Sequence, residues 1–127
     1  MSSRPIFLRF LHLTQAISGE WTASNLDFTA LRLLEELAIA HSQGESMTVT
    51  EAMNLGFIAS PATLHRKLDQ LREAGYIDFS FKGTNRRTKF LVPTEIAEKY
   101  FEHMGKALLT ALKPALCTFD LSNYPCA

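Results

Sequence analysis

Four basic side chains lie within eight residues near the middle of the chain: Lys82, Arg86, Arg87 and Lys89. Gly83 and Asn85 stand among them, and these residue types are typical of a tight turn. Cations presented together on a turn can bind the phosphates of a nucleic acid, and arginine is attracted to the negative potential of the minor groove. The cluster predicts contact with DNA, although a basic turn that is simply solvated is the ordinary alternative.

A second set of polar groups lies upstream, in residues 60–74, which are predicted to form a helix with Leu64, Leu68 and Leu71 directed inward. Its outer face and flanks carry small and hydrogen-bonding residues suited to entering a major groove: Ser60, Pro61, Ala62, Thr63, His65, Arg66 and Gln70. Ala62 permits close approach, and Arg66 can bind guanine O6 and N7 together. The acidic residues of this face, Asp69 and Glu73, come farther along the helix.

The chain around these groups reads as a regular series of elements. Ser60 is a preferred N-cap, Pro61 suits the first helical position, and Gly75 suits the left-handed position after the helix end. Period-two alternation then predicts a strand, a basic turn and a returning strand. The expected elements are helices at 5–18, 27–41, 48–55, 60–74 and 94–113, strands at 77–82 and 88–92, and an irregular tail at 114–127 that begins with Pro114.

This order predicts a mainly α fold with a small β-hairpin, an α+β winged helix-turn-helix. We expect one domain over residues 1–127, with a DNA-binding core at 26–93 and a basic wing at 82–89. Apolar stripes on the last helix are too wide to be covered by one small domain, which favours packing against the first helix and a second copy of the chain. The predicted dimer interface is Ile6, Phe10, Leu13, Ile17, Tyr100, Phe101, Met104 and Leu108.

The sequence resembles the MarR-type winged-helix regulators over residues 26–100. The resemblance rests on residues 26–34, the segment 60–71, Ala74-Gly75-Tyr76-Ile77, the tip Asn85-Arg86-Arg87, and Val92-Pro93-Thr94-Glu95. It implies a dimer of intertwined terminal helices that binds duplex DNA, with the following contact residues: Pro61, Ala62, Thr63, His65, Arg66 and Arg87. The chain departs from the family at Asn85, where aspartate is common, at Lys67, where the position is usually apolar, and at Ala97, where a glycine is usual.

Composition limits the remaining possibilities. The net charge is zero, yet residues 60–90 carry seven basic and three acidic residues, a local balance of +4. No nucleophile–base pair, phosphate loop or metal-ligand spacing stands out, so we expect a non-enzyme without metal or cofactor. Arg9 interrupts the apolar N-terminal run, and no membrane-length segment follows, so we expect a soluble cytoplasmic protein without a signal peptide.

Three alternatives stay open. The neutral total charge, with Asp69 and Glu73 on the outer face, also suits a protein-interaction module that does not bind DNA. Apolar residues of the terminal helices can line a pocket for a small-molecule effector instead of an interface: Phe7, Phe10, Trp21 and Tyr100. Cys117 and Cys126 can act as ordinary thiols or as a redox switch.

Overall fold

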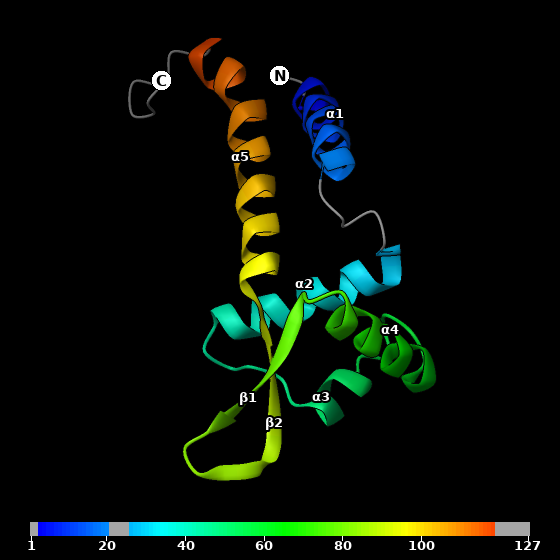
Figure 1. Cartoon of the computed structure of the whole chain (residues 1–127). Coiled ribbons are helices and arrows are strands. Elements are labelled where there is room, and N and C mark those ends of the chain that lie inside the picture. Colours follow the sequence, from blue (N-terminus) through cyan, green and yellow to red (C-terminus); the bar gives the residue numbers. More distant parts are fainter. Residues whose placement is uncertain (1–2, 21–25, 119–127) are drawn as a thin grey trace. The chain divides into compact units, whose positions relative to one another are not determined.

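The computed structural model describes residues 3–20 and 26–118, with side chains at 3–15 and 26–113. The elements in chain order are α1 (Arg4–Glu20), α2 (Phe28–Ser42), α3 (Val49–Met53), α4 (Pro61–Glu73), β1 (Ile77–Lys82), β2 (Asn85–Pro93) and α5 (Glu95–Thr118) (Figure 1). This order confirms the predicted winged helix-turn-helix. The chain forms two compact units, one of Asn25–Glu98 and one of Met1–Ser24 with Lys99–Ala127.

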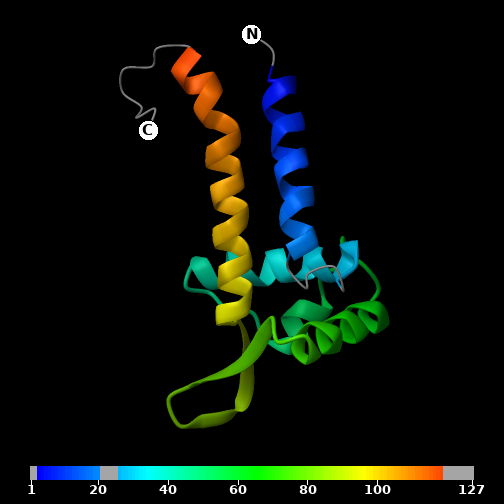
Figure 2. The same cartoon turned by 45° about the horizontal axis from the view of Figure 1, so that its top comes forward.

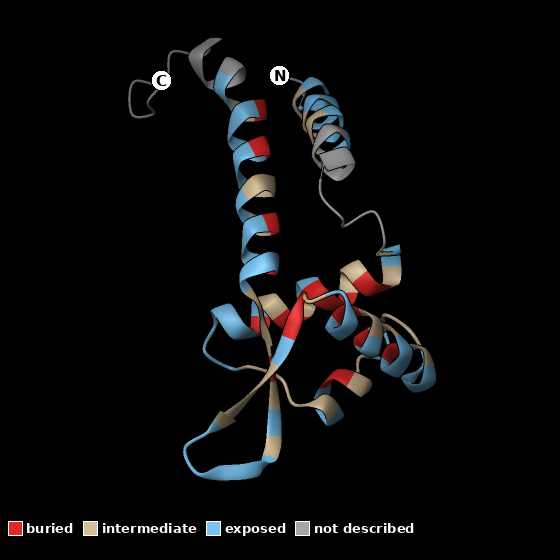
Figure 3. Cartoon of the chain, in the orientation of Figure 1, coloured by how far each residue is buried: buried red, intermediate tan, exposed pale blue. Residues whose placement is uncertain are grey.

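The unit of residues 25–98 is built on a leucine core. Helix α2 contacts both α4 and β2, and α3 contacts α4. The predicted line of Leu64, Leu68 and Leu71 is at most 3% exposed. Helix α4 packs against α2, and Figure 3 shows buried residues on both helices. Burying one such side chain contributes about 1.5–3 kcal/mol, so these contacts hold α4 on the domain and leave its other face to solvent.

Helix α4 begins and ends as its sequence predicts. Ser60 is the N-cap, and its hydroxyl accepts a hydrogen bond from the Thr63 N–H at 3.4 Å. At the other end Gly75 takes a φ of +85°, while the Tyr76 N–H donates to the Leu71 carbonyl at 3.0 Å. This pattern is the glycine-terminated helix end that turns the chain sharply into β1.

Gly75→Ala is expected to lower the free energy of unfolding by about 1–2 kcal/mol, because a side chain is strained at this φ. A Cβ there also lies 3.3 Å from Cδ1 of Ile96, so that side chain must shift. Gly56→Ala is the matched control, since Gly56 has no neighbour within 4 Å of a Cβ and no positive φ. Urea denaturation of both variants measures the difference, and equal stabilities would contradict the strain argument.

The hairpin is tighter than the sequence indicates. Strand β2 was expected from Thr88, but it begins at Asn85, which pairs with Lys82 across the two residues Gly83 and Thr84. Gly83 has a φ of +58°, which closes a turn this short. A register shift between Ser80 and Lys82 accompanies the turn. Most of the expected basic turn is therefore strand, and Arg86 and Arg87 lie in the irregular stretch of β2 between the pairs Lys82–Asn85 and Ser80–Phe90.

Both terminal helices are longer than the sequence indicates. Helix α1 extends to Glu20, beyond the expected end at Ser18, a difference within the usual range for helix ends. The expected end of the last helix at Lys113 is wrong, because α5 continues through Pro114 to Thr118 (Figure 2). Proline removes one backbone donor, which a long helix can tolerate when its remaining hydrogen bonds persist. The expected irregular tail is thus helical at 114–118, and its remainder lies outside the described residues.

No described helix combines the length and the apolar character that crossing a bilayer requires.

Candidate nucleic-acid interface

The outer face of α4 presents most of its predicted groups to solvent. Ala62, Arg66, Asp69 and Glu73 are all exposed, as the helical wheel requires. Of the other predicted contact residues on this helix, Ser60, Pro61 and His65 are exposed, whereas Thr63 and Gln70 are half-buried. The first two turns of α4 therefore present small, mostly uncharged side chains to solvent, together with one exposed arginine, Arg66.

Three of these groups are already engaged within the helix. The Ser60 hydroxyl donates to Oγ1 of Thr63 at 3.1 Å, so both hydroxyls belong to the helix cap. His65 Nδ1 lies 3.4 Å from a carboxylate oxygen of Asp69, one turn farther on. The two hydroxyls and the imidazole must exchange these partners before they can contact a base, which leaves Ala62 and Arg66 as the groups best placed for direct contact.

The basic side chains of the hairpin lie over aromatic rings. The cationic group of Lys82 is 4.5 Å from the centre of the Phe90 ring, and that of Arg86 is 5.0 Å from Phe81. Such contacts contribute about 0.5–1 kcal/mol each at exposed sites. They restrain long side chains that are otherwise free to rotate. The exposed cations of the wing are held at the hairpin surface and remain accessible (Figure 3).

Arg87 differs from the other wing cations. Its backbone N–H donates to Oδ1 of Asn85 at 3.0 Å, so the side chain at 85 fixes the backbone at the start of β2. Asparagine at this position, where the resemblance makes aspartate common, thus accepts from the Arg87 backbone and carries no charge to pair with the guanidinium. Among the described residues, no side chain pairs with the exposed Arg87 guanidinium, which leaves it available to a ligand.

A shallow groove between α3 and β2 adjoins Arg87. It has a volume of about 280 Å³ and is lined by Thr48, Val49, Thr50, Arg87, Thr88 and Lys89. Its two cations and the hydroxyls of Thr50 and Thr88 are groups that bind phosphate oxygens, whereas the Thr48 hydroxyl donates to the Glu51 carboxylate in the cap of α3. Residues 48–50 were not among the predicted contact residues, because only the folded chain brings the start of α3 to β2.

A stacked contact joins α4 to the wing. The Arg72 guanidinium lies 4.1 Å from the centre of the Phe79 ring, and the Lys89 ammonium lies 4.8 Å from the same ring. Phe79 thereby links the last turn of α4 to the strand that carries the wing cations. Sequence alone did not single out Arg72 or Phe79, although the alternation of β1 marks Phe79 as one of its apolar positions.

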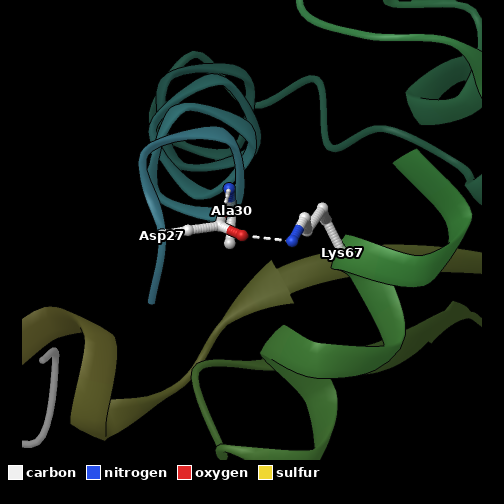
Figure 4. Close-up of polar contacts among 3 residues, drawn as sticks. All are labelled: Asp27, Ala30 and Lys67. Carbon is white, nitrogen blue, oxygen red and sulfur yellow. Dashed lines mark hydrogen bonds and ion pairs between the residues drawn. The ribbon is translucent and has the colours of Figure 1, made fainter. Parts of the chain in front are cut away.

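An ion pair joins α4 to the start of α2 (Figure 4). Asp27, the N-cap of α2, accepts from the Ala30 N–H at 2.8 Å through one oxygen, and its other oxygen binds the Lys67 ammonium. The hydrogen bond from Lys67 and that from the Ala30 backbone hold the pKa of Asp27 below its usual value. The carboxylate is therefore ionised under ordinary conditions and can act as cap and ion-pair partner together.

The predicted interface residues of the terminal helices are mostly half-buried or buried. Tyr100 is 8% exposed and Leu108 is 47% exposed; Ile6, Phe10, Leu13, Phe101 and Met104 fall in between, and the side chain of Ile17 lies outside those described. The other exposed apolar side chains of these helices are Phe7, Leu8, Leu11, Ile96 and Leu109, and of these only Phe7 and Leu109 are more exposed than Leu108. A second copy of the chain would gain most by covering Phe7, Leu108 and Leu109.

Other chemistry has little support among the described residues. No group of three or more histidine, cysteine or carboxylate side chains is suited to a metal ion in the described part of the chain. The side chains of Cys117 and Cys126, for which a redox switch was one alternative, lie outside those described. So does Trp21 of the alternative effector pocket.

Comparison with known proteins identifies the fold. No protein-family model matches the sequence, and no curated protein is significantly similar to it. Among solved structures, RV1404 from Mycobacterium tuberculosis is similar with a TM-score of 0.63 and 18% identity, over 94% of this chain and 75% of that one. A MarR-like transcriptional regulator from Thermotoga maritima is similar with a TM-score of 0.58 and 19% identity, over 91% of this chain and 82% of that one.

A third structure is the heme sensor PefR from Streptococcus agalactiae in complex with heme, with a TM-score of 0.55 and 15% identity, over 90% of this chain and 76% of that one. Identities this low show a shared fold and leave the activity to be argued from the residues. The predicted resemblance is confirmed at the level of architecture: this chain has the winged-helix fold of the MarR-type transcription regulators.

Proposed function

We propose that this protein is a sequence-specific, double-stranded DNA-binding transcription regulator. One observation carries the proposal: the exposed N-terminal half of α4, with Ala62 and Arg66, belongs to the same compact unit as a hairpin whose strands carry Lys82, Arg86, Arg87 and Lys89. A helix that buries a leucine line and exposes small and basic groups suits the major groove. A basic hairpin suits the flanking backbone and minor groove.

The residues divide by role. Arg66 reads a base edge, and Ala62 allows α4 to approach the groove floor. Arg87 and Lys89, with the hydroxyls of the α3–β2 groove, bind backbone phosphates and set the register of the protein on the duplex. Lys82 and Arg86 add affinity that does not depend on sequence. Asp69 and Glu73 lie toward the other end of α4, which orients the helix with its N-terminal half in the groove.

The proposed active form is a homodimer on a pseudo-palindromic operator. Two copies would place their α4 helices in successive major grooves about 34 Å apart. The exposed apolar side chains of α1 and α5 support dimerisation through the terminal helices. A small-molecule effector that binds near these helices would regulate the dimer, and the heme sensor with the same fold is a precedent for ligand control.

The test is selection of bound duplexes from a random library by the purified protein. A regulator enriches one motif with two related half-sites, whereas enrichment of no motif would contradict the proposal. Retention on duplex DNA at moderate salt separates it from the rival reading, a protein-interaction module. The exposed Asp69 and Glu73 favour that rival slightly, since two carboxylates on α4 repel phosphate.

Arg86→Ala with Arg87→Ala is expected to weaken binding to every duplex and to flatten the dependence of affinity on salt. Each lost phosphate contact reduces the slope of log K against log salt by about 0.9. A double variant at the exposed Lys106 and Lys113 of α5 removes the same charge from outside the hairpin and should leave the slope nearly unchanged. Fluorescence anisotropy over a salt series gives the slopes, and identical slopes for both double variants would refute the wing assignment.

A further inference from the structure

Lys67 occupies an unusual place for a lysine. It lies on α4 between the inward-facing Leu64 and Leu68, and its side chain is only 15% exposed. Burying an ammonium group is costly unless a charged partner compensates it. That partner is Asp27, which is 40 positions away in the sequence and whose side chain is 47% exposed, so the pair lies at the edge of the α2–α4 contact. The pair is thus a specific tertiary contact. It places the charge of Lys67 at a position where an apolar side chain could pack.

Asp27 is itself held in place. One oxygen caps α2 through the Ala30 N–H at 2.8 Å while the other binds Lys67 (Figure 4). A carboxylate that makes both bonds has its orientation fixed by the first turn of α2. The Lys67 ammonium must therefore lie at one defined point relative to that turn. The contact therefore fixes where Lys67 lies relative to α2, in addition to keeping the two helices close together.

The remaining contacts between α4 and α2 are less directional. The other buried residues of the two helices are apolar, and packing of such side chains leaves a scatter of about 15–20° in the angle between two helices. A hydrogen-bonded ion pair requires a particular geometry. A recognition site tolerates misplacement of only about 0.5 Å or 10–20° before its contacts weaken. Arg66 is the neighbour of Lys67 on α4, so any rotation at Lys67 moves the Arg66 guanidinium.

We infer that Lys67 is a positioning residue for DNA recognition, which acts by fixing the rotation and register of α4 on α2 through Asp27. This inference rests on the proposed function and adds to it the determinant of specificity that lies outside the DNA contact surface. Loss of the pair leaves the wing cations in place, so affinity for DNA of any sequence persists. The discrimination between the operator and unrelated DNA falls instead.

The experiment uses four variants of the full chain: Lys67→Met, Lys67→Arg, Asp27→Asn, and Lys67→Met with Asp27→Asn. Methionine keeps the length of the side chain without the charge, and asparagine keeps the cap of α2. Dissociation constants are measured for the selected operator and for an unrelated duplex, well below the melting temperature of each variant. Residual dipolar couplings of the α2 and α4 amides in the DNA-free protein report the angle between the helices.

We expect Lys67→Met to reduce the ratio of operator to unrelated-duplex affinity by about tenfold, comparable to one mismatched base pair. Affinity for the unrelated duplex should change by less than about twofold, because the phosphate contacts are intact. The double variant should have the same ratio of operator to unrelated-duplex affinity as Lys67→Met. Lys67→Arg keeps the charge and should keep most of the wild-type ratio. A Lys106→Met variant controls for the loss of one charge.

The couplings test the inference independently of DNA. If Lys67→Met changes the α2–α4 angle, the positioning role stands even where the wild-type protein selects no operator, and only the proposed function fails. An unchanged angle overturns the inference, whatever the DNA results. An unchanged affinity ratio in a protein that does select an operator overturns it as well.

Discussion

Ala62→Glu is expected to reduce operator affinity by at least about a hundredfold without loss of stability. Ala62 is exposed at the second position of α4, at the end of the helix that enters the groove in the proposed complex. A carboxylate there meets the negative potential of the groove and fills the space that alanine leaves for the bases, and such losses readily exceed ~3 kcal/mol. In the free protein the same carboxylate interacts favourably with the helix dipole, by about 0.3–1 kcal/mol.

The opposite signs of the two effects make this a sharp test. Urea denaturation should show equal or higher stability for Ala62→Glu, while anisotropy shows loss of operator binding. Ala74→Glu makes the same chemical change at the exposed C-cap of α4 and is the matched control. It should cost a little stability, because a carboxylate opposes the dipole there, and little affinity. Operator binding by Ala62→Glu at the wild-type level would exclude α4 as the groove-entering helix.

Local chemistry explains why α4 was predictable from sequence. Ser60, Pro61 and Gly75 each act within a few residues of the helix end that they define, and all three take the predicted roles. The leucine line follows from the helical period alone. The exposed face of α4 could be derived from these facts, because the face opposite a buried line must meet solvent.

Contacts between distant segments were not predictable in the same way. Aspartate is a residue type that suits the cap at the start of α2, but nothing local shows that the second oxygen of Asp27 binds Lys67. The link from Arg72 through Phe79 to Lys89 likewise needs three elements to meet. Lys67 carried one signal, a charge at a position that the resemblance makes apolar. An unexpected charge on an otherwise apolar side of a helix is a reason to search for a distant partner.

The errors at element ends have physical causes as well. The two-residue turn at Gly83 and Thr84 let pairing begin at Asn85, so residues with turn chemistry became strand. Pro114 removes one hydrogen bond but fits within a helix whose other bonds continue. In both cases a residue type that usually interrupts an element was tolerated because its neighbours could keep their hydrogen bonds.

Phe7→Glu with Leu109→Glu is expected to convert the proposed dimer to monomer. These side chains are 58% and 61% exposed, and they are among the most exposed apolar groups on α1 and α5. In a dimer formed by the terminal helices, the double change would bury four carboxylates without partners, at a cost of several kcal/mol for each pair of charges. Loss of the second half-site contact should then lower operator affinity by about 10²–10⁴-fold.

Phe28→Glu distinguishes dimerisation from a general response to surface charge. Phe28 is 84% exposed, more than either of the other two, but it lies at the start of α2 in the unit of residues 25–98. Sedimentation equilibrium should find Phe28→Glu in the same oligomeric state as the wild type and the double variant at half the mass. If the wild-type protein is already a monomer at micromolar concentration, or if the double variant keeps the wild-type mass, the terminal helices do not form the interface. In that case the exposed apolar residues of α1 and α5 mark a contact with a partner other than a second copy of the chain. An exposed apolar patch on two helices is costly to leave in water.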